Sequence, residues 1–369
     1  MRSGRKSIFR ETRGLRPSIA PALWLSLAGW LVAGASAAQT RPDASRPGTY
    51  RDEARVERVI LDAHVTDRRG EALAGLSPVD FELKVDGAVV PLESADWIPA
   101  GEPEVPLLAP ADSSAPDTRP REAAPGRLLI FFFQTDYTTS RLVGLVRMGL
   151  EARRFLDTLL PSDRVAVLSF DSHLKLRQDF TGDRPRILAA IHSSLRTGSP
   201  EPSEPEPGPS LARHFDYSAA QDAVTPEGAL ALIARAAAPI PGGKEMLFFG
   251  WGLQTIGGMS GPNPRDRIDF AEAVPALARA RITIFSLDVT NADYHSLEGT
   301  LSNISDLTGG TYAKTHIFPG AAMDSVRRAI AGRYVLVFRK PEGPRGVHTV
   351  GVRLLAKKGT VLARGYYED

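Results

Sequence analysis

The 369-residue chain contains no cysteine. This absence excludes disulfide bonds, cysteine-ligated zinc or iron–sulfur centres, and a cysteine nucleophile. The glycine-rich phosphate loop, the Gly-x-Ser-x-Gly nucleophile elbow and the His-Glu-x-x-His zinc motif are also missing. The seven histidines are scattered, and no two of them stand at metal-ligand spacing on one predicted helix. Because no catalytic constellation emerges, we expect the protein not to be an enzyme.

Basic residues are concentrated at the amino terminus. The chain carries 45 Lys and Arg against 43 Asp and Glu, which gives a formal net charge of +2. Residues 1–38 hold six of the basic side chains and a single acidic one, a local charge of +5, so the remaining chain carries −3. A weakly acidic folded part lacks the basic surface that binds a phosphate backbone, and we expect no nucleic-acid partner.

The same segment has the organisation of an export signal. Its arginine-rich start is followed by an uncharged apolar run, Ile19–Ala33, and by the small residues Ala35-Ser36-Ala37-Ala38. This order predicts a signal peptide, residues 1–38, with cleavage near Ala37 or Ala38. The alternative is an uncleaved anchor, because the apolar run is only slightly shorter than the roughly 20 residues that span a bilayer. We expect a periplasmic or secreted bacterial protein that meets a membrane only through such an uncleaved segment.

A small β module follows a short tether. Residues 39–55 lack apolar periodicity and predict a disordered tether. In the range 56–98, apolar residues alternate with more polar ones from Val59 to Thr66, which is typical of a strand with one dry face. A later alternating run ends at Asp86-Gly87, a strong hairpin signal. Because a module of this size has a marginal core, we expect it to pack against its neighbour.

A proline-rich linker, residues 99–125, separates this module from a region in which strands alternate with helices. In that region, 126–332, the continuously apolar run Leu128–Phe133 predicts a central parallel strand covered on both faces. Further buried strands are predicted at Val165–Phe170, Glu245–Phe249 and Ile282–Leu287, and an edge strand at Leu174–Phe180. The expected fold is α/β, a doubly wound and mostly parallel sheet. Strands in 333–369 are expected to complete the small β module.

Oxygen-bearing side chains follow the first buried strand of this sheet. Asp136, Thr138 and Ser140 stand at alternate positions in the loop after residue 134. In open α/β sheets, ligands collect outside the carboxyl ends of the strands, where the strand order reverses. A carboxylate and two hydroxyls suit a hard cation such as magnesium. The alternative is that Thr138, Thr139 or Ser140 caps the helix that follows.

Asp288 and Asp293 come after the predicted strand Ile282–Leu287. They lie near the same edge of the sheet and form a second potential acidic pair. We expect Asp288 instead to end the strand and to stabilise a turn.

Several motifs, taken in order, resemble the von Willebrand factor type A domain and in particular the exported bacterial proteins with a VWFA-related domain. The motifs are Val65–Gly70, Gly75-Leu76, Asp80–Leu83, Asp86-Gly87, Leu128–Phe133, Phe155-Leu156, Pro161–Val167, Ser169-Phe170, Leu307–Tyr312, Tyr334–Leu336 with His348, and Gly365–Tyr367. No single motif is specific, but their order is. The resemblance covers most of the chain after residue 38 and implies a von Willebrand A-like sheet preceded by a β prelude.

Members of this family with a working metal-ion-dependent adhesion site carry Asp-x-Ser-x-Ser, a later threonine, and an aspartate after the fourth strand. Here Asp136-x-Thr138-x-Ser140 preserves the oxygen chemistry but lies two residues late. Alignment on the strand places Gln134, Asp136 and Thr138 at those positions, and the first carboxylate is lost. Thr225 matches the later threonine, whereas Trp251 occupies the place of the aspartate. The resemblance therefore implies a degenerate metal site.

The expected function is that of an exported, noncatalytic protein that binds an unidentified protein partner. The partner-binding candidates are Gln134, Asp136, Tyr137, Thr138, Ser140, Thr225 and Trp251. Trp251 is either a plug in the vacated site or, with Tyr137 and Met259, part of an apolar contact surface. The alternative function is a magnesium-dependent adhesion module in which Asp136, Thr138, Ser140 and Thr225 hold the ion. No other cofactor is expected.

Overall fold

A six-stranded sheet in the order β10-β9-β8-β5-β6-β7 forms the centre of the computed structural model. Its strands are β5 (Leu128–Gln134), β6 (Arg164–Phe170), β7 (Leu174–Thr181), β8 (Lys244–Gly250), β9 (Ile282–Asp288) and β10 (Tyr312–Lys314). Only the edge strand β7 runs antiparallel to its neighbour. The strand order reverses between β5 and β8, so the sheet is doubly wound, and the predicted fold class is confirmed.

The structure describes residues 57–104, 126–196, 198, 200, 205, 207–253, 264–355 and 358–369, and of residues 264–267 only the backbone. All of them lie in the unit Arg55–Asp369. The predicted signal peptide (1–38), the predicted tether (39–55), most of the predicted linker (99–125) and Met259 lie outside the described residues. Within the described part of the chain, no helix is both long and apolar enough to cross a bilayer.

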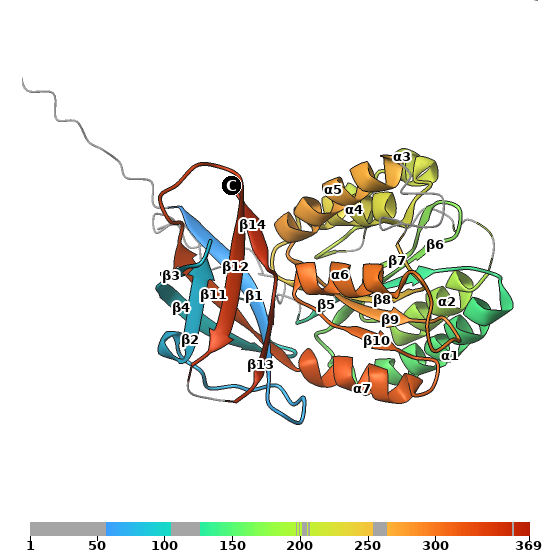
Figure 1. Ribbon diagram of the computed structural model, residues 1–369. Coiled ribbons are helices and arrows are strands. Elements are labelled where there is room, and N and C mark those ends of the chain that lie inside the picture. Colours follow the sequence, from blue (N-terminus) through green and yellow to red (C-terminus); the bar gives the residue numbers. More distant parts are fainter. Residues whose placement is uncertain are drawn as a thin grey trace, which may run out of the picture. The chain divides into compact units, whose positions relative to one another are not determined.

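Helices cover both faces of the sheet, as Figure 1 shows. They are α1 (Thr139–Leu156), α2 (Arg184–Ser194), α3 (Tyr217–Asp222), α4 (Pro226–Ala237), α5 (Pro264–Arg279), α6 (Glu298–Thr308) and α7 (Pro319–Ala329), with the short 3-10 helices η1 (Pro78–Asp80) and η2 (Ala212–His214). Alternate residues of β5 enter different cores. Ile130 and Phe132 pack with α4, α5 and α6, whereas Phe131 and Phe133 pack with α1, α2 and α7. This two-sided burial explains the uninterrupted apolar run.

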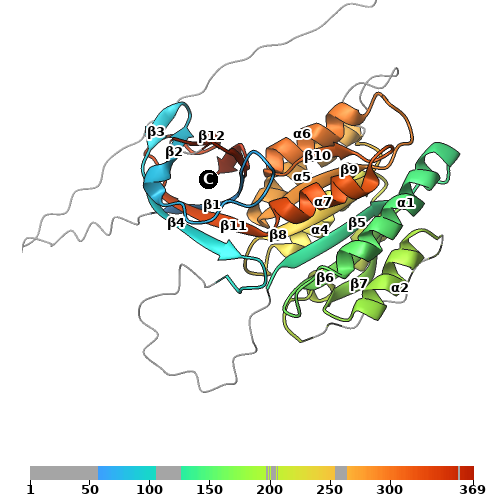
Figure 2. The same ribbon diagram turned by 90° about the horizontal axis from the view of Figure 1, so that it is seen from below.

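Strands from both ends of the described chain form the β module, seen end-on in Figure 2. Its sheets have the orders β13-β1-β11-β4 and β14-β12-β2-β3. The strands are β1 (Arg58–Thr66), β2 (Phe81–Val85), β3 (Ala88–Val90), β4 (Leu92–Pro99), β11 (Gly332–Arg339), β12 (Val347–Leu354), β13 (Thr360–Ala363) and β14 (Tyr366–Glu368). Leu61 of β1 lies opposite Leu336 of β11, so the prediction that the last strands complete the module is confirmed.

The hairpin between β2 and β3 turns at Asp86 and Gly87, as predicted. Both residues have positive φ, 49° and 83°, which suits the tight turn that matches the twist of two antiparallel strands. Within the predicted range 333–369, the residues from Thr360 to Glu368 form two strands, β13 and β14, in different sheets. The break falls at Arg364, whose guanidinium turns inward and donates to the carbonyls of Ile60 and Ala278.

Both faces of β1 are covered. Leu61, Ala63 and Val65 enter the core of the β module. The opposite face contacts β9 and α7. On that opposite face His64 is buried, with its ring centroid 5.5 Å from that of Phe285 on β9. Asp62 forms ion pairs there with Arg281. The polar face of β1 is therefore an internal contact surface rather than a solvated one.

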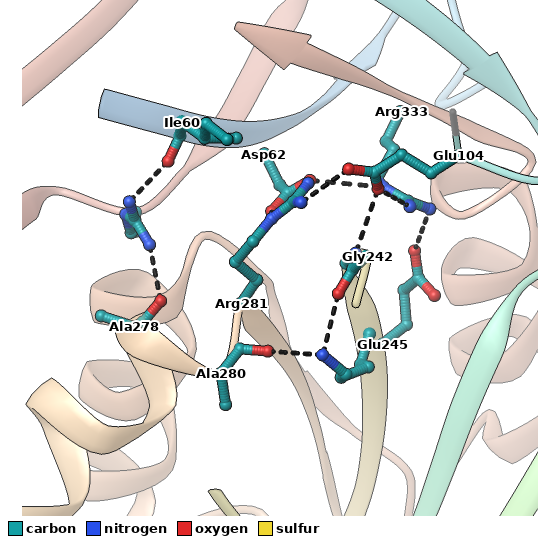
Figure 3. A network of polar contacts seen from close by, with 12 residues as sticks. Ile60, Asp62, Glu104, Gly242, Glu245, Ala278, Ala280, Arg281 and Arg333 are labelled. Carbon is teal, nitrogen blue, oxygen red and sulfur yellow. Dashed lines mark hydrogen bonds and ion pairs between the residues drawn. The ribbon is translucent and has the colours of Figure 1, made fainter. Parts of the chain in front are cut away.

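An ionic network joins the β module to the sheet (Figure 3). Arg281 donates to both carboxylate oxygens of Asp62, at 2.8 and 2.6 Å, and to Glu104 at 2.6 Å. Arg333 of β11 donates to Glu104 at 2.7 Å and to Glu245 of β8 at 3.3 Å. Burial opposes ionisation of Asp62, but Arg281 and Arg333 outweigh it and lower the pKa of its carboxyl group. The network thus connects charged groups from both parts of the fold.

Candidate binding site at the carboxyl edge of the sheet

The carboxyl ends of β5 and β8 lie beside each other at the point where the strand order reverses. The loop after β5 carries Asp136, Tyr137 and Thr138, and the loop after β8 carries Trp251. Because ligands of open α/β sheets collect at this position, it is the candidate site of the fold.

Gln134, the last residue of β5, fixes the loop that follows β8. Its side-chain nitrogen Nε2 donates to the carbonyl of Gly252 at 2.8 Å. Its oxygen Oε1 accepts from the backbone N–H groups of Trp251 and Gly252, at 2.9 and 3.3 Å. The side chain is buried, and both of its polar atoms are engaged inside the protein. Gln134 therefore offers no surface to a partner and acts on the site by positioning Trp251.

Gly252 allows the loop after β8 to pass close to Leu297. Its φ angle of 149° belongs to a backbone conformation that L side chains rarely adopt. A Cβ atom added at this position would lie 2.4 Å from the Cβ of Leu297. The backbone after β8 is consequently fixed from two sides, by Gln134 and by this close approach.

Asp136 is paired with a cation from the same chain. Its Oδ1 accepts from the backbone N–H of Thr138 at 2.8 Å, and its Oδ2 accepts from the guanidinium of Arg141 on α1. Partial burial opposes ionisation, but the Thr138 N–H and Arg141 more than offset it, and the pKa of Asp136 is lowered. The carboxylate is thus ionised, and Arg141 neutralises its charge.

Arg141 also contacts Trp251. Its Cζ lies 3.6 Å from the centroid of the Trp251 ring, the geometry of a cation–π interaction. The indole packs against the core beneath α1 and α2, and it is half-buried. Arg141 was missed by the sequence analysis, which sought oxygen ligands for a cation. The only signal in the sequence was a basic residue five positions after the candidate carboxylate.

Thr138, Ser140 and Tyr137 are exposed at this edge. Thr138 occupies the N-cap position of α1, but its side chain makes no capping hydrogen bond to the helix. The carbonyl of Ser140 accepts from the N–H of Asn291, which ties α1 to the loop after β9 at 2.9 Å. Of the predicted partner-binding residues, these three present side chains to solvent.

Thr225 is buried, and its hydroxyl group contacts helices α4 and α5. It is the N-cap of α4, and its hydroxyl oxygen accepts from the N–H of Gly228 at 3.0 Å. The same hydroxyl donates its proton to the carboxylate of Asp269 on α5. Thr225 therefore caps α4 and joins it to α5, a role that the sequence analysis did not predict.

A second polar group lies at the end of β9. Asp288, His295 and Glu298 offer ligand atoms within 4.8 Å of one another. They are already paired: Asp288 contacts His295 Nε2 at 2.7 Å and the Tyr312 hydroxyl at 2.8 Å, and Lys314 lies 2.8 Å from Glu298. Asp288 Oδ1 accepts from the N–H of Thr290, so the prediction that it ends the strand and stabilises a turn is confirmed.

Asp293 lies outside that group. Its side chain is exposed and pairs with His316 at 3.0 Å. The acidic pair considered for Asp288 and Asp293 is therefore replaced by two separate contacts with histidines.

Solved structures with a similar arrangement share little sequence with this chain. The von Willebrand factor type A protein from Catenulispora acidiphila is 11% identical and matches 83% of this chain and 76% of its own, with a TM-score of 0.37. BatB from Bacteroides thetaiotaomicron is 12% identical and matches 56% of this chain and 99% of its own, with a TM-score of 0.34. Proximal thread matrix protein 1 from the mussel byssus, solved with a zinc-occupied MIDAS motif, is 11% identical to this chain. It matches 58% of this chain and 49% of its own, with a TM-score of 0.37.

The structural neighbours thus include a protein that carries the family name expected from the sequence, at low identity. No protein-family model and no curated protein matches the chain.

Proposed function

We propose that this chain is an exported, noncatalytic protein of von Willebrand A-like fold whose carboxyl sheet edge binds a protein partner without a metal ion. The observation that carries the proposal is the placement of exposed aromatic side chains. Tyr137, Tyr294 and Phe318 are 47%, 76% and 69% exposed, and they are the exposed aromatic residues of the described part of the chain. We call these three residues the edge aromatics.

Each edge aromatic lies in a different loop, and all three loops follow strands of the parallel sheet. Tyr137 follows β5, Tyr294 follows β9 and Phe318 follows β10, so all three are carried at the same edge. Arg147 of α1 donates to the carbonyl of His316, and this contact ties α1 to the loop that carries Phe318. Exposed aromatic residues are typical of the residues that dominate binding energy in protein interfaces.

The donor set at this edge does not fit the metal that the family resemblance implies. Asp136 is the carboxylate of the loop after β5, and Arg141 already neutralises it. Trp251 stands where a second carboxylate is needed, and both polar atoms of Gln134 are engaged by the backbone. A divalent cation prefers several oxygen ligands with compensating charge. It would have to displace a guanidinium that is held both by Asp136 and by the Trp251 ring, so the proposal contains no metal.

Partner capture tests this proposal. The purified chain is immobilised, exposed to an envelope extract of the source cells, and compared with the double variant Tyr137→Ala, Phe318→Ala. A matched control, Val79→Ala with Val347→Ala, truncates exposed apolar residues of the β module. We expect one envelope protein to be retained by the wild type and the control and lost by the double variant, equally in magnesium and in chelator. Retention that disappears in chelator would instead support a magnesium-dependent adhesion module.

Export is part of the proposal and rests on the organisation of residues 1–38. Fractionation of cells that express the full chain tests it, because a cleaved protein in the periplasm or medium has an amino terminus near Gln39. Recovery of the intact chain in the cytosol would contradict export.

A further inference from the structure

Three aliphatic side chains are exposed on one face of helix α1. Val143, Val146 and Leu150 are 37%, 45% and 53% exposed. Their spacing of three and four residues aligns them along the helix, and we call them the α1 stripe. Leu145 and Met148 of the same helix are fully buried in the core that α1 forms with the sheet. Helix α1 is thus apolar on two faces, and within the described part of the chain only one of them is covered.

Helix α1 lies in the middle of its layer. Figure 2 shows it between α7 and α2 on one face of the six-stranded sheet, and it contacts both helices. Neither neighbour covers the α1 stripe, because its side chains remain exposed. Single exposed apolar side chains are common on soluble proteins, whereas a row of them on an outer helix is a candidate interaction surface.

The loop before α7 extends this apolar surface. It carries Ile317 and Phe318, which are 58% and 69% exposed. Arg147, one turn after Val143 on α1, donates to the carbonyl of His316 at 3.2 Å, so the loop lies beside the helix at this level. Phe318 is one of the edge aromatics. The α1 stripe therefore adjoins the surface proposed above to bind a partner.

The charged residues exposed along the α1 stripe are all arginines. From residue 143 to residue 154, the exposed residues of α1 other than the stripe are Arg147, Arg153 and Arg154. Arg154 pairs with Glu151, whereas Arg147 and Arg153 have no carboxylate partner among the described residues. Even when Asp136 and the C-cap residue Asp157 are counted with Glu151, the carboxylates at this helix are fewer than its four arginines.

The two neighbouring helices do not reverse this charge. Helix α2 carries Arg184 and Arg186 against one carboxylate, that of its N-cap Asp183. The arginines of α7 pair with Asp324 and Glu71 and add no net charge. The exposed side of α1 and α2 is therefore positive, and it is complementary to a partner with acidic residues.

An α-helix is the element that fits a stripe of this shape. Side chains spaced three and four residues apart form ridges that pack into the grooves of a second helix with the same spacing. A second copy of this chain is a poor occupant, because α1 packed on α1 brings the arginines of both copies together. A partner helix with glutamate or aspartate beside its apolar face meets both features of the α1 stripe, the hydrocarbon and the flanking positive charge.

We propose that the α1 stripe binds an acidic amphipathic helix of the partner protein. Val146 and Leu150 contact the apolar face of that helix, and Arg147 and Arg153 pair with carboxylates beside it. This inference rests on the proposed function, because it assigns a chemistry to the partner that the edge aromatics bind. The edge aromatics and the α1 stripe then contact two parts of one partner.

Site-specific photocross-linking of the full chain tests the chemistry of the partner. Leu150→p-benzoylphenylalanine is exposed to the envelope extract and irradiated, and the linked peptide is sequenced. Val89→p-benzoylphenylalanine, at a 66% exposed position of β3, is the control. We expect a link only from position 150, to the protein that the edge aromatics retain. The linked peptide is expected to have a helical period of apolar residues and a negative net charge. A peptide that is basic or lacks this period would overturn the proposal.

The linked segment, synthesised as a peptide, is then titrated against variants by fluorescence anisotropy. We expect Arg153→Glu, and the pair Val146→Ser with Leu150→Ser, each to weaken binding about tenfold. Matched controls are Arg235→Glu, an exposed arginine of α4 on the other face of the sheet, and the pair Val79→Ser with Val347→Ser. These controls are expected to bind like the wild type. Equal binding by all variants would overturn the assignment.

The outcomes separate this inference from the proposed function. If the extract yields no retained protein, the proposed function fails and this inference fails with it. If a protein is retained through the edge aromatics but does not link to position 150, the proposed function stands and the α1 stripe does not contact the partner. Cosedimentation with phosphatidylglycerol vesicles that is lost in Arg153→Glu would assign the α1 stripe to a lipid surface and overturn the proposal.

Discussion

Arg141 lies over the ring of Trp251 while its guanidinium pairs with Asp136. One side chain of α1 thus supplies positive charge to the loop after β5 and covers the residue that follows β8. In this arrangement the positive charge that balances Asp136 comes from a side chain of the protein.

Replacement of Arg141 tests this arrangement. Arg141→Ala removes both the ion pair and the cation–π contact, each partly exposed, and we expect a loss of about 1 kcal/mol in the free energy of unfolding. The double variant Arg141→Ala, Asp136→Asn is expected to lose less of the free energy of unfolding than Arg141→Ala, because it contains no unpaired carboxylate at position 136. Urea unfolding is the measurement. Arg153→Ala, an exposed arginine on the same helix, is the control and is expected to change stability by less than about 0.5 kcal/mol.

Divalent cations are expected to leave the wild-type protein unchanged. A ligand that binds only the folded state stabilises it by about 2.7 kcal/mol at a hundredfold excess over its dissociation constant. Thermal unfolding in magnesium, manganese, calcium and chelator is expected to give one midpoint. A stabilisation by metal that is lost in Asp136→Ala would contradict this and support the adhesion alternative.

Removal of one partner of the ion pair between Asp62 and Arg281 is expected to lower the free energy of unfolding. Both side chains are mostly buried, so Arg281→Met leaves the carboxylates of Asp62 and Glu104 without their main partner. We expect a loss of about 3 kcal/mol in unfolding free energy, measured in denaturant. Arg353→Met removes a similar two-bond pair with Glu82 at an exposed position and is expected to have little effect. Equal losses in the two variants would show that burial of the network is unimportant.

Acid is expected to destabilise the protein through His64. Burial, with the nearby charge of Arg333, lowers the pKa of His64 to about 4. Between pH 6.5 and 4, His64 binds a proton in the unfolded chain but not in the folded chain. The free energy of unfolding therefore falls as pH falls. The fall attributable to His64 is about 3 kcal/mol over this window.

The comparison of wild type with His64→Leu in denaturant at several pH values measures this contribution. We expect a shallower fall in the variant between pH 6.5 and 4. His348 is the control, because its hydrogen bond with Asp86 raises its pKa and gives it the opposite sign. His348→Gln is therefore expected to make the fall steeper or to leave it unchanged, and a shallower fall in that variant would contradict the assignment.

The sequence predicted those features that depend on local pattern. The apolar run Leu128–Phe133 predicted a strand buried on both faces, and Asp86-Gly87 predicted a hairpin, because residue type and spacing determine both. Contacts between distant residues had no such signal. From the sequence, His64 and Asp62 are expected on the solvated face of a strand. No residue near them in the sequence indicates that they contact Phe285 and Arg281.

At the candidate site, the sequence indicated that the loops after β5 and β8 lie at the same edge of the sheet, but not the contacts between them. The family resemblance placed Gln134 and Trp251 at positions where related domains carry metal ligands. That the Gln134 amide would bind the backbone of Trp251 and Gly252 depends on the separation of β5 and β8, which only the folded sheet defines. Arg141 was missed because an arginine that pairs with a neighbouring loop cannot be told from its sequence position apart from any other arginine of a helix.

The pairing of β1 with β11 has a consequence for the order in which the chain acquires its structure. Strand β1 is synthesised early and β11 late, with the entire six-stranded sheet between them. Until β11 and β13 have been synthesised, β1 with its apolar residues Leu61, Ala63 and Val65 has neither of its partner strands. An unpaired apolar strand is prone to aggregate. The β module can therefore close only after the strands of the sheet have been synthesised. If the chain is exported as proposed, we expect it to depend during export on a chaperone that shields β1.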